Sequence, residues 1–448
     1  MKRLTYSGRL YNDRRQFYLE GRNEPVMLYA SETPFISSLF ARGGEQTKDK
    51  DFKIFEHRAA WRYQSMKANE GAGGSIAWST DGTPGDTVQI PVDDPNGVNV
   101  DSSLIGQTFD LYDANQENYK GQVLVTNVSG SNVTLKSSGN PKAATEAISA
   151  IQDDDVLVTN ATAFGEGDDA PDAYHDDLDI VFNSVQRLKT AVEITEDLRR
   201  ASLRPNGSPE LARLRNEKQR EHKIRKEKLF LLGVRPGGIG GVAHGAGGGQ
   251  DNSFVNHITD ADGNTVTKTM GIIPALLRYG VSDPTADDQN IFSPDASSFD
   301  YAQFALNTGK IFQYGGRGVK TAYCGWKVMA FFSTLFTANS SWNVEISGMQ
   351  TSRLGFNYRM LETPHGVIRL VPMPIFRRTM WDSSMLIVED SLVKRKVYAP
   401  EEYRTNIVTD NAPDKQKDVF QAWDGLCINL VEKHSLWNFS NIMSAMTA

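Results

Sequence analysis

The sequence predicts an α+β fold in which strands and helices occupy separate blocks of the chain. Apolar and polar residues alternate between residues 86 and 158, which is typical of strands with one buried face. Helical spacing and helix-start signals follow between residues 176 and 233, and the last third of the chain is again rich in strand patterns. This block order favours α+β architecture over a doubly wound parallel sheet.

The composition is that of a globular protein large enough for several compact units. The 448 residues are 39% hydrophobic and 23% charged, and 38 glycines indicate many turns and loops. Cys324 and Cys427 have apolar or aromatic neighbours, which predicts buried thiols in place of a disulfide framework. We expect neither a secretory leader nor a membrane span, and we place synthesis of the chain in a cytoplasm.

Charge is distributed unevenly along the chain. Residues 81–180 contain 19 Asp and Glu against 3 Lys, a balance of −16, which leaves +9 for the rest of a chain whose net charge is −7. This predicts one acidic, solvated module beside a body of mixed or basic surface. Acidic loops that only keep a β-module soluble explain the balance equally well.

Residues 1–50 are expected to form an extended N-terminal arm. Aromatic and arginine side chains are scattered there with little periodicity, and Thr33-Pro34-Phe35 lies near the end of the segment. Such a segment cannot build its own core, and it gains order by lying on another surface, often that of a neighbouring subunit.

Residues 51–180 are expected to form an extended loop with an inserted β-module at residues 86–158. Ser129-Gly130-Ser131 is typical of a hairpin turn, and the close spacing of the strands predicts a small barrel or sandwich. Glycine-rich stretches at 71–74 and 165–169 flank the module. The apolar residues that define its strands are Val88, Ile90, Val92, Phe109, Leu111, Val123, Val125, Val128, Val133, Leu135, Val156 and Val158.

Two helices are predicted after this module. The first covers residues 176–203, because apolar residues recur at helical spacing through Val181, Val185, Leu188, Val192 and Thr195.

The second helix is predicted after the break at Pro205-Asn206-Gly207. Ser208 followed by Pro209 is a strong helix start, and the helix can run to Gly233. It is dense in mixed charge up to Lys228, so we expect much of its surface to be solvated, with ion pairs four residues apart, or to face other subunits.

The remaining chain is predicted to alternate loops, helices and strands. A glycine-rich loop covers 237–249, and a hairpin-like turn lies around Asp260–Asn264. Helices are expected near 272–279 and 300–314. Strands are expected at 356–361, 367–373, 385–389, 393–398 and 420–437.

Motifs that imitate chemical sites lack residues that the chemistry needs. Gly238–Ala243 partly matches a dinucleotide fingerprint but follows a helix, and Gly315–Thr321 has no adjacent Gly-Lys-Thr for phosphate binding. Asp260–Asn264 starts like a calcium loop but lacks glycine at the sixth position and glutamate at the twelfth. The acidic clusters at 153–155 and 176–177 are interpreted as solvated loops.

No residue is therefore assigned a catalytic, cofactor-binding or metal-binding role. The seven histidines show no metal-ligand spacing, and no Gly-x-Ser-x-Gly nucleophile motif occurs. We expect no cofactor and no enzymatic activity. An enzyme whose site is assembled from distant residues is a competing interpretation.

Five short segments occur in a definite order between residues 30 and 400. They are Thr33-Pro34-Phe35 with Leu39, Ala163–Gly167, Asn183–Gln186 with its continuation through Glu193 to Arg200, Tyr358–Ile368, and Leu386–Asp390 followed by Val393–Tyr398. In this order they resemble the major capsid proteins of tailed phages with the Hong Kong 97 fold, in particular a podophage-type family first described as a domain of unknown function.

The resemblance implies a division of the chain into four parts. These are the arm at 1–50, the extended loop at 51–180, a peripheral domain with a long spine helix at 181–235 and 350–400, and an axial domain at 236–349 and 401–448. The break at 205–207, which bends or splits the spine, and the large module at 86–158 depart from the simplest members of that family.

The resemblance also implies a function and partners. The chain is expected to self-assemble into pentamers and hexamers of an icosahedral head around double-stranded DNA, to be located in the virion, and to be assembled in the host cytoplasm. Portal, scaffolding and decoration proteins and packaged DNA are the expected partners, with no membrane. The alternative is a phage tail or baseplate protein whose β-module recognises a ligand, although the module offers only Phe109, Tyr112 and Tyr119 as an aromatic platform.

Overall fold

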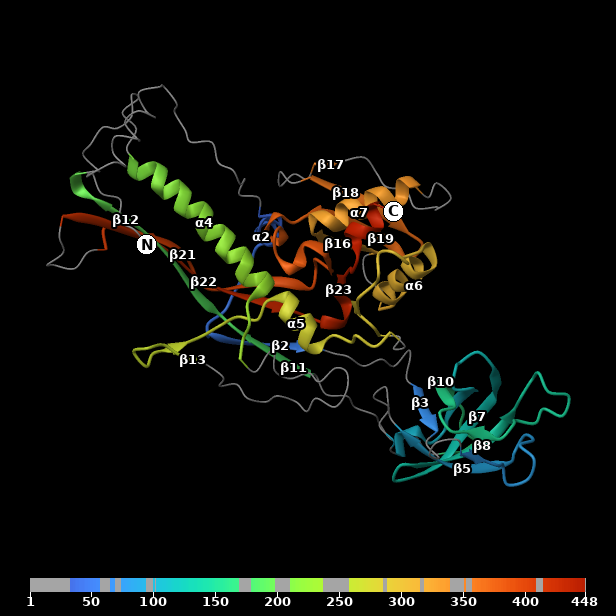
Figure 1. Ribbon diagram of the computed structural model, residues 1–448. Coiled ribbons are helices and arrows are strands. Elements are labelled where there is room, and N and C mark those ends of the chain that lie inside the picture. Colours follow the sequence, from blue (N-terminus) through green and yellow to red (C-terminus); the bar gives the residue numbers. More distant parts are fainter. Residues whose placement is uncertain are drawn as a thin grey trace. The chain divides into compact units, whose positions relative to one another are not determined.

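The computed structural model divides the chain into two compact units. They are Met1–Glu56 with Asp179–Ala448, which we call the body, and His57–Leu178, which we call the barrel unit. Both are drawn in Figure 1. The structure describes residues 33–56, 65–68, 74–93, 100, 102–168, 179–197, 210–236, 258–284, 288–314, 318–338, 350–351, 357–407 and 414–447. The predicted α+β class is confirmed.

The barrel unit contains a closed six-stranded barrel in the order β10-β3-β5-β8-β7-β6. The barrel strands are β3 (Ser65–Ala68), β5 (Thr87–Asp93), β6 (Gln107–Tyr112), β7 (Tyr119–Ser129), β8 (Asn132–Gly139) and β10 (Val156–Thr162). Beside it, β4 (Ser75–Ile76) pairs with β9 (Ile151–Gln152), and Ser102–Leu104 forms a 3-10 turn, η1. The small barrel expected from the sequence is therefore present, and it also includes β3, which precedes residue 86.

Alternating side chains fill the barrel as the period-two pattern predicts. Residues such as Ile90, Phe109 and Val133 are fully buried in one apolar cluster. The last strand differs from the prediction, because Leu157 lies opposite Leu111 and joins the cluster, whereas Val158 is half-buried. A register that places Leu157 inward necessarily turns Val158 outward.

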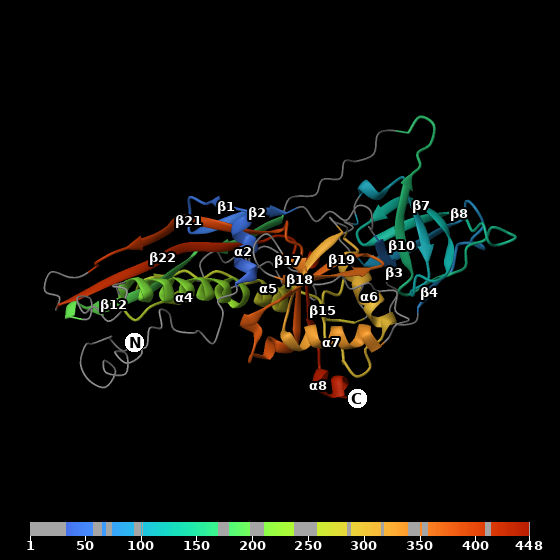
Figure 2. The same ribbon diagram turned by 90° about the horizontal axis from the view of Figure 1, so that it is seen from above.

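The body contains a four-stranded sheet in the order β1-β21-β22-β12. Its strands are β1 (Gly44–Gln46), β21 (Val393–Arg404), β22 (Lys415–Ile428) and β12 (Gln186–Thr195). The long helix α4 (Glu210–Leu232) runs beside the three long strands, as Figure 2 shows. We call these four strands the long sheet.

A seven-stranded sheet in the order β15-β23-β20-β16-β19-β18-β17 forms the other large layer of the body. Its strands are β15 (Ile291–Phe292), β16 (Val319–Cys324), β17 (Gln350–Thr351), β18 (Asn357–Thr363), β19 (Gly366–Pro372), β20 (Ser384–Val388) and β23 (Ser435–Asn438). The helices nearby are α5 (Ile272–Tyr279), α6 (Tyr301–Phe312), α7 (Trp326–Ala338) and α8 (Ile442–Thr447), with 3-10 turns η2 (Pro374–Phe376), η3 (Met380–Ser383) and η4 (Val431–Lys433).

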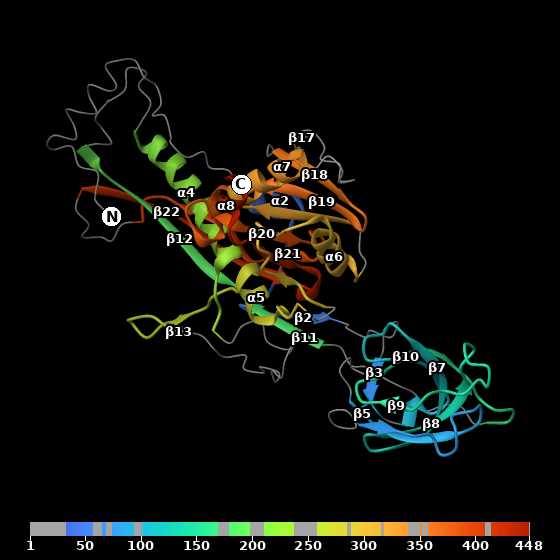
Figure 3. The ribbon, with the colours of Figure 1, turned by 45° about the vertical axis from the view of Figure 1, so that its right-hand side comes forward.

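Two antiparallel pairs complete the body. The strand β2 (Asp51–Glu56) pairs with β11 (Asp179–Ser184), and β13 (Ile258–Thr259) pairs with β14 (Thr265–Val266) around the turn predicted at Asp260–Asn264. Figure 3 shows the first pair side by side. The helices predicted near 272–279 and 300–314 and the strands predicted after residue 356 are confirmed, with the last one divided into β22 and β23.

The helix predicted over residues 176–203 is wrong. Residues 179–195 form β11 and β12, and the ten residues of β12 pair in unbroken register with β22. Thr190, Val192 and Ile194 are buried in turn, which is the period of a strand. Asn183, expected to open the spine helix, lies in β11, where its side-chain amide donates to the carbonyls of Met270 and Leu426 at 3.1 and 2.7 Å.

The second predicted helix is confirmed as α4, which is the long helix of the fold. Its predicted start at Ser208 and Pro209 and the break at 205–207 lie outside the described residues, as does the glycine-rich loop at 237–249 with its dinucleotide-like motif.

The end of the predicted extended arm forms a helix. In α2 (Pro34–Ala41), proline occupies the first turn, where its missing N–H costs nothing, and Phe35, Ile36 and Leu39 are buried in the main core of the body. Residues 1–32 lie outside the described part of the chain.

Both cysteines are buried and free, as the sequence predicts. Burial raises the pKa of the Cys427 thiol to about 12 and raises that of Cys324 as well, so both thiols stay protonated at neutral pH.

Candidate functional site

The helix α4 is held on the long sheet by apolar contacts at its two ends. Near its start, Leu211 and Leu214 pack with Val192, Ile194 and Phe420 of the sheet. Near its end, Phe230 and Leu231 enter the main core of the body. Between these contacts the buried side of the helix is polar, which is unusual because a buried charge is stable only when it is paired.

A buried ion-pair network joins the middle of α4 to β21 and β22. The Lys226 ammonium lies 2.8 Å from Asp424 and 2.9 Å from Glu401, and only 1% of Lys226 is exposed. The Arg395 guanidinium also binds Asp424, at 2.8 and 3.0 Å, and stacks 4.3 Å from the centre of the Phe40 ring. Asp424 therefore neutralises cations from two different elements.

A second buried carboxylate, Asp418, belongs to the same strand, β22, as Asp424. Asp418 accepts two hydrogen bonds from Arg215 of α4, at 2.7 and 2.9 Å, and one from the Tyr403 hydroxyl at 2.5 Å. Burial alone would raise its pKa, but hydrogen bonds from Tyr403, from the backbone of Asn406 and from Arg215 hold the pKa of Asp418 below its ordinary value. This carboxylate therefore stays ionised, and its contact with Arg215 fixes α4 to β22 of the long sheet.

Two further titratable groups of α4 are completely buried. The ring of His222 lies 3.0 Å from the Thr190 hydroxyl, and burial, reinforced by the Lys226 charge, lowers its pKa. Glu227 accepts a hydrogen bond from the backbone N–H of Phe35 at 3.4 Å, and burial raises its pKa to about 8. At neutral pH both groups are therefore uncharged.

The outward surface of α4 is cationic. Six described cations of α4 lie outside the buried network, and Glu217 and Glu221 lie between them in the sequence. The helix also begins with a carboxylate residue, Glu210. These six cations, which we call the α4 cationic surface, are Arg213, Lys218, Arg220, Lys223, Arg225 and Lys228.

The point where the barrel unit joins the body is a strand pair. Glu56, the last residue of β2, lies opposite Asp179, the first residue of β11, and Phe55 lies opposite Ile180. Phe55 is 64% exposed and Ile180 is 39% exposed. The entire barrel unit is thus inserted between two residues that are direct cross-strand neighbours.

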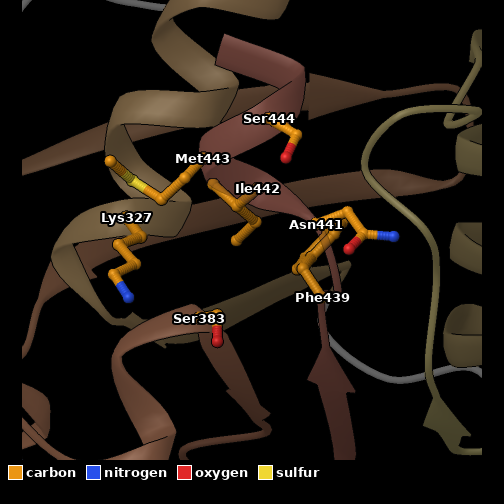
Figure 4. Close-up of a pocket in the computed structure, with 7 residues that line it drawn as sticks. All are labelled: Lys327, Ser383, Phe439, Asn441, Ile442, Met443 and Ser444. Atoms are coloured by element: carbon orange, nitrogen blue, oxygen red, sulfur yellow. The ribbon is translucent and has the colours of Figure 1, made fainter. Parts of the chain in front are cut away.

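A small hollow lies beside α8 on the body, as Figure 4 shows. It encloses about 200 Å³ and is lined by Lys327, Ser383, Phe439, Asn441, Ile442, Met443 and Ser444. One ammonium, two hydroxyls and an amide line it, with no carboxylate, imidazole or thiol among these residues. Such a lining can hold a small polar group, but it contains no acid–base pair for catalysis.

Several sequence motifs imitate chemical sites but lack residues that the chemistry needs. Where the structure describes these motifs, their side chains have structural roles. Lys320, at the end of the phosphate-loop imitation, is buried and donates to the carbonyls of Ile311 and Lys433 at 3.0 and 2.7 Å. Asp260 caps its own turn through the backbone N–H groups of Asp262 and Asn264. Of the 153–155 cluster, Asp155 is buried against Lys120 at 2.5 Å.

Within the ranges that the structure describes, no set of three His, Cys, Asp or Glu side chains is grouped as a metal site would require. Across the same ranges, no helix combines the length and the hydropathy needed to span a membrane.

Comparison with known proteins finds one matching family and several solved structures of low sequence identity. The family model described as SU10 major capsid protein matches residues 102–423, well over half of the chain. No curated protein sequence matches the chain.

Three solved structures illustrate the structural likeness. The Mycobacterium phage Bobi structure has 8% identity over 95% of this chain and 98% of that chain, with a TM-score of 0.39. The capsid of cyanophage Pam1 has 10% identity, coverage of 63% and 82%, and a TM-score of 0.35. The SrpI encapsulin of Synechococcus elongatus has 9% identity, coverage of 58% and 77%, and a TM-score of 0.35. At these sequence identities and TM-scores, the solved structures do not assign a family to this chain, and the assignment depends on the family model.

Proposed function

The chain belongs to the SU10 major capsid protein family, and we propose that it builds the head shell of a tailed phage by self-assembly into pentamers and hexamers around double-stranded DNA. The match over residues 102–423 is the observation that carries this proposal, because it includes most of the barrel and all of α4 and β21. No observation favours the alternative of a tail or baseplate recognition protein.

The construction of the body supports a role in a lattice. The long sheet and α4 bury few apolar residues against each other, and their contact depends on paired charges. A subunit that contributes one layer of a shell needs long elements of this kind, which have large surfaces available to neighbouring copies. The exposed pair Phe55 and Ile180 adds an apolar surface of the type found in subunit contacts.

The domain division is proposed along the two sheets of the body. We assign the long sheet with α4 to the peripheral domain and the seven-stranded sheet with α5 to α8 to the axial domain. This differs from the division expected from the sequence in two segments, because β22 pairs along its length with β12 and β21, and β18 to β20 pair within the seven-stranded sheet.

The remaining proposals concern the partners of the chain and its location in the virion. The chain is a structural, non-enzymatic component of the virion, assembled in the host cytoplasm. Its partners besides other copies of itself are the portal, a scaffolding protein, decoration proteins and the packaged DNA. The acidic barrel unit contacts a neighbouring copy or decorates the outer surface of the shell, since its carboxylates are repelled by DNA phosphates.

Removal of the barrel unit tests whether the body alone forms the lattice. Because Glu56 and Asp179 are cross-strand neighbours, residues 57–178 can be replaced by Asn-Gly, which favours the tight turn of a two-residue hairpin. We expect this variant to be soluble and folded, with its unfolding transition close to that of the body in the full chain, and to assemble into shells of altered size or stability. Circular dichroism, urea unfolding and negative-stain electron microscopy measure these properties.

The matched control replaces the same residues with a flexible Gly/Ser linker of several residues, which tolerates an imperfect hairpin. If both variants are unfolded, the barrel unit is part of the folding core of the body and the proposed modular arrangement is wrong.

A further inference from the structure

The long sheet has a cationic face on the side opposite α4. Thr190 contacts His222 of α4, and Phe420 packs with Leu211 near the start of the same helix. Odd-numbered residues of β12 lie opposite odd-numbered residues of β22, so these residues of both strands point away from α4. Figure 2 shows α4 along one side of these strands, and we call the other side the open face.

The open face carries more positive than negative charge after its ion pairs are counted. The four strands of the long sheet place seven cations and three carboxylates on it, which leaves an excess of four cations. Within the described residues, Arg187, Lys189 and Lys417 pair with no carboxylate. The three carboxylates are all paired: Glu45 with Lys394 and Lys396 at 2.7 and 2.5 Å, Glu193 with Lys415 at 3.2 Å, and Glu402 with Arg404 at 2.9 Å.

Other carboxylates near the sheet do not cancel this excess. At the end near Arg187, the segment 48–53 joins the sheet and carries two carboxylates and three lysines. At the far tip, six residues and about 20 Å from Lys189, the strands end beside three carboxylates. The positive charge is therefore greatest around Arg187 and Lys189. The carboxylates at the tip are Glu196, Asp197 and Asp414.

Trp423 gives the open face an aromatic anchor. The Arg187 guanidinium lies 4.7 Å from the centre of the Trp423 ring, and Val419 and Ala191 are half-buried further along the same face. Tryptophan and arginine are the residue types that concentrate binding energy in protein interfaces, whereas nucleic-acid interfaces depend chiefly on cations that contact phosphates. The open face therefore suits a protein partner that presents carboxylates around an apolar side chain.

The barrel unit carries a surface of this kind. Phe164 is 44% exposed and Ile105 is 36% exposed. They lie close together, because the Phe164 ring lies against the backbone of Gly106, the neighbour of Ile105. Residues 161–168 are exposed, contain two carboxylates and have no lysine or arginine. Ile105, Phe164, Glu166 and Asp168 form what we call the acidic edge.

We propose that the acidic edge of one copy docks on the open face of a second copy, around Arg187, Lys189 and Trp423. The inference rests on the proposed function, in which copies of this chain form a shell, and it identifies two surfaces that meet there. The two surfaces differ and belong to different units of the chain, so each copy offers one and accepts the other. Contacts of this head-to-tail kind close into rings.

The test reverses charge on the open face of the whole chain. The variant R187E/K189E places like charges opposite the acidic edge. We expect it to need about thirtyfold more protein than the wild type to assemble, because opposed like charges destabilise an interface strongly. Light scattering and negative-stain electron microscopy measure assembly, and circular dichroism confirms folding. If R187E/K189E is unfolded, R187Q/K189Q takes its place.

A second charge reversal and a matched control make the result specific. The variant E166K lowers the negative charge of the acidic edge, so adding it to R187E/K189E should restore assembly in part. The control R377E/R378E reverses two exposed arginines elsewhere on the body, and we expect a change of less than about fivefold. The inference is wrong if the control impairs assembly as much as R187E/K189E does, or if E166K restores nothing.

Crosslinking between isotopically labelled copies identifies the partner directly. A carbodiimide joins lysines to carboxylates in contact with them, and it is applied to particles assembled from equal amounts of ¹⁴N and ¹⁵N chains. We expect mass spectrometry to find Lys189 joined to Glu166 or Asp168 between a light and a heavy chain. Crosslinks of Lys189 to these carboxylates within single chains only, or none at all, overturn the inference.

The same experiments separate this inference from the proposed function. A wild-type chain that forms shells while R187E/K189E forms them equally well refutes the contact and leaves the shell function standing. A wild-type chain that forms only small oligomers, with Lys189 crosslinked between light and heavy copies, retains the contact and contradicts the shell function.

Discussion

Replacing Asp424 by asparagine is expected to lower the free energy of unfolding of the body by about 3–5 kcal/mol. The change keeps the shape of the side chain but leaves Lys226 and Arg395 without the carboxylate that both contact, in a site where Asp424 is only 2% exposed. Glu401 compensates in part, since it lies 2.9 Å from Lys226. Urea unfolding followed by circular dichroism measures the loss.

An exposed ion pair of the same sheet provides the control. Glu402 pairs with Arg404 at 2.9 Å, and both side chains are largely exposed, so Glu402→Gln should cost less than about 1 kcal/mol. If Asp424→Asn costs no more than this control, the buried network does not hold α4 to the long sheet.

Replacing Glu227 by glutamine is expected to remove a pH dependence from the stability of the body. Burial raises the pKa of Glu227 from 4.5 to about 8. Between these values the folded state keeps a proton that the unfolded state releases, so wild-type stability falls as the pH rises. From pH 5 to pH 7.5 this amounts to about 3 kcal/mol, at 1.36 kcal/mol for each pH unit. Glutamine has no such proton, so the variant gains stability relative to the wild type by this amount.

The measurement is the difference in unfolding free energy between variant and wild type at a series of pH values, which cancels the other titrating groups. Glu217→Gln, on the exposed side of the same helix, is the control for removing one carboxylate from α4. A flat difference for Glu227→Gln would show that this carboxyl is solvated or paired in the folded protein.

Local patterns in the sequence were sufficient for the elements whose side chains follow a simple period. The barrel strands alternate because one face of each is inside the barrel, and α4 contains a long run of helix-forming residues. These features depend on neighbours in the sequence, so sequence patterns reveal them directly.

The strand β12 could not be predicted in this way. Val181, Val185, Leu188 and Val192 have helical spacing, but the same segment also buries Thr190, Val192 and Ile194 in alternation. Pairing with β22, from the far end of the chain, decides between the two periods. The helix α7 was missed for a related reason, because its run of Val, Met, Phe and Leu is apolar on most sides and gives no clear period.

The candidate site was predictable only as a charged helix. The sequence indicates that α4 is polar and solvated in part, and the Glu221–Arg225 pair follows the expected four-residue spacing. The buried contacts of Lys226 and Arg215 depend on Asp424 and Asp418, which lie on another element distant in sequence.

Negative-stain electron microscopy with light scattering of the purified chain, over a range of salt and protein concentration, tests whether the chain assembles into a shell. We expect rings of five or six subunits, shells, tubes or sheets under at least one condition. A strictly monomeric or dimeric particle under every condition, and equally in the presence of a phage scaffolding protein, would contradict it.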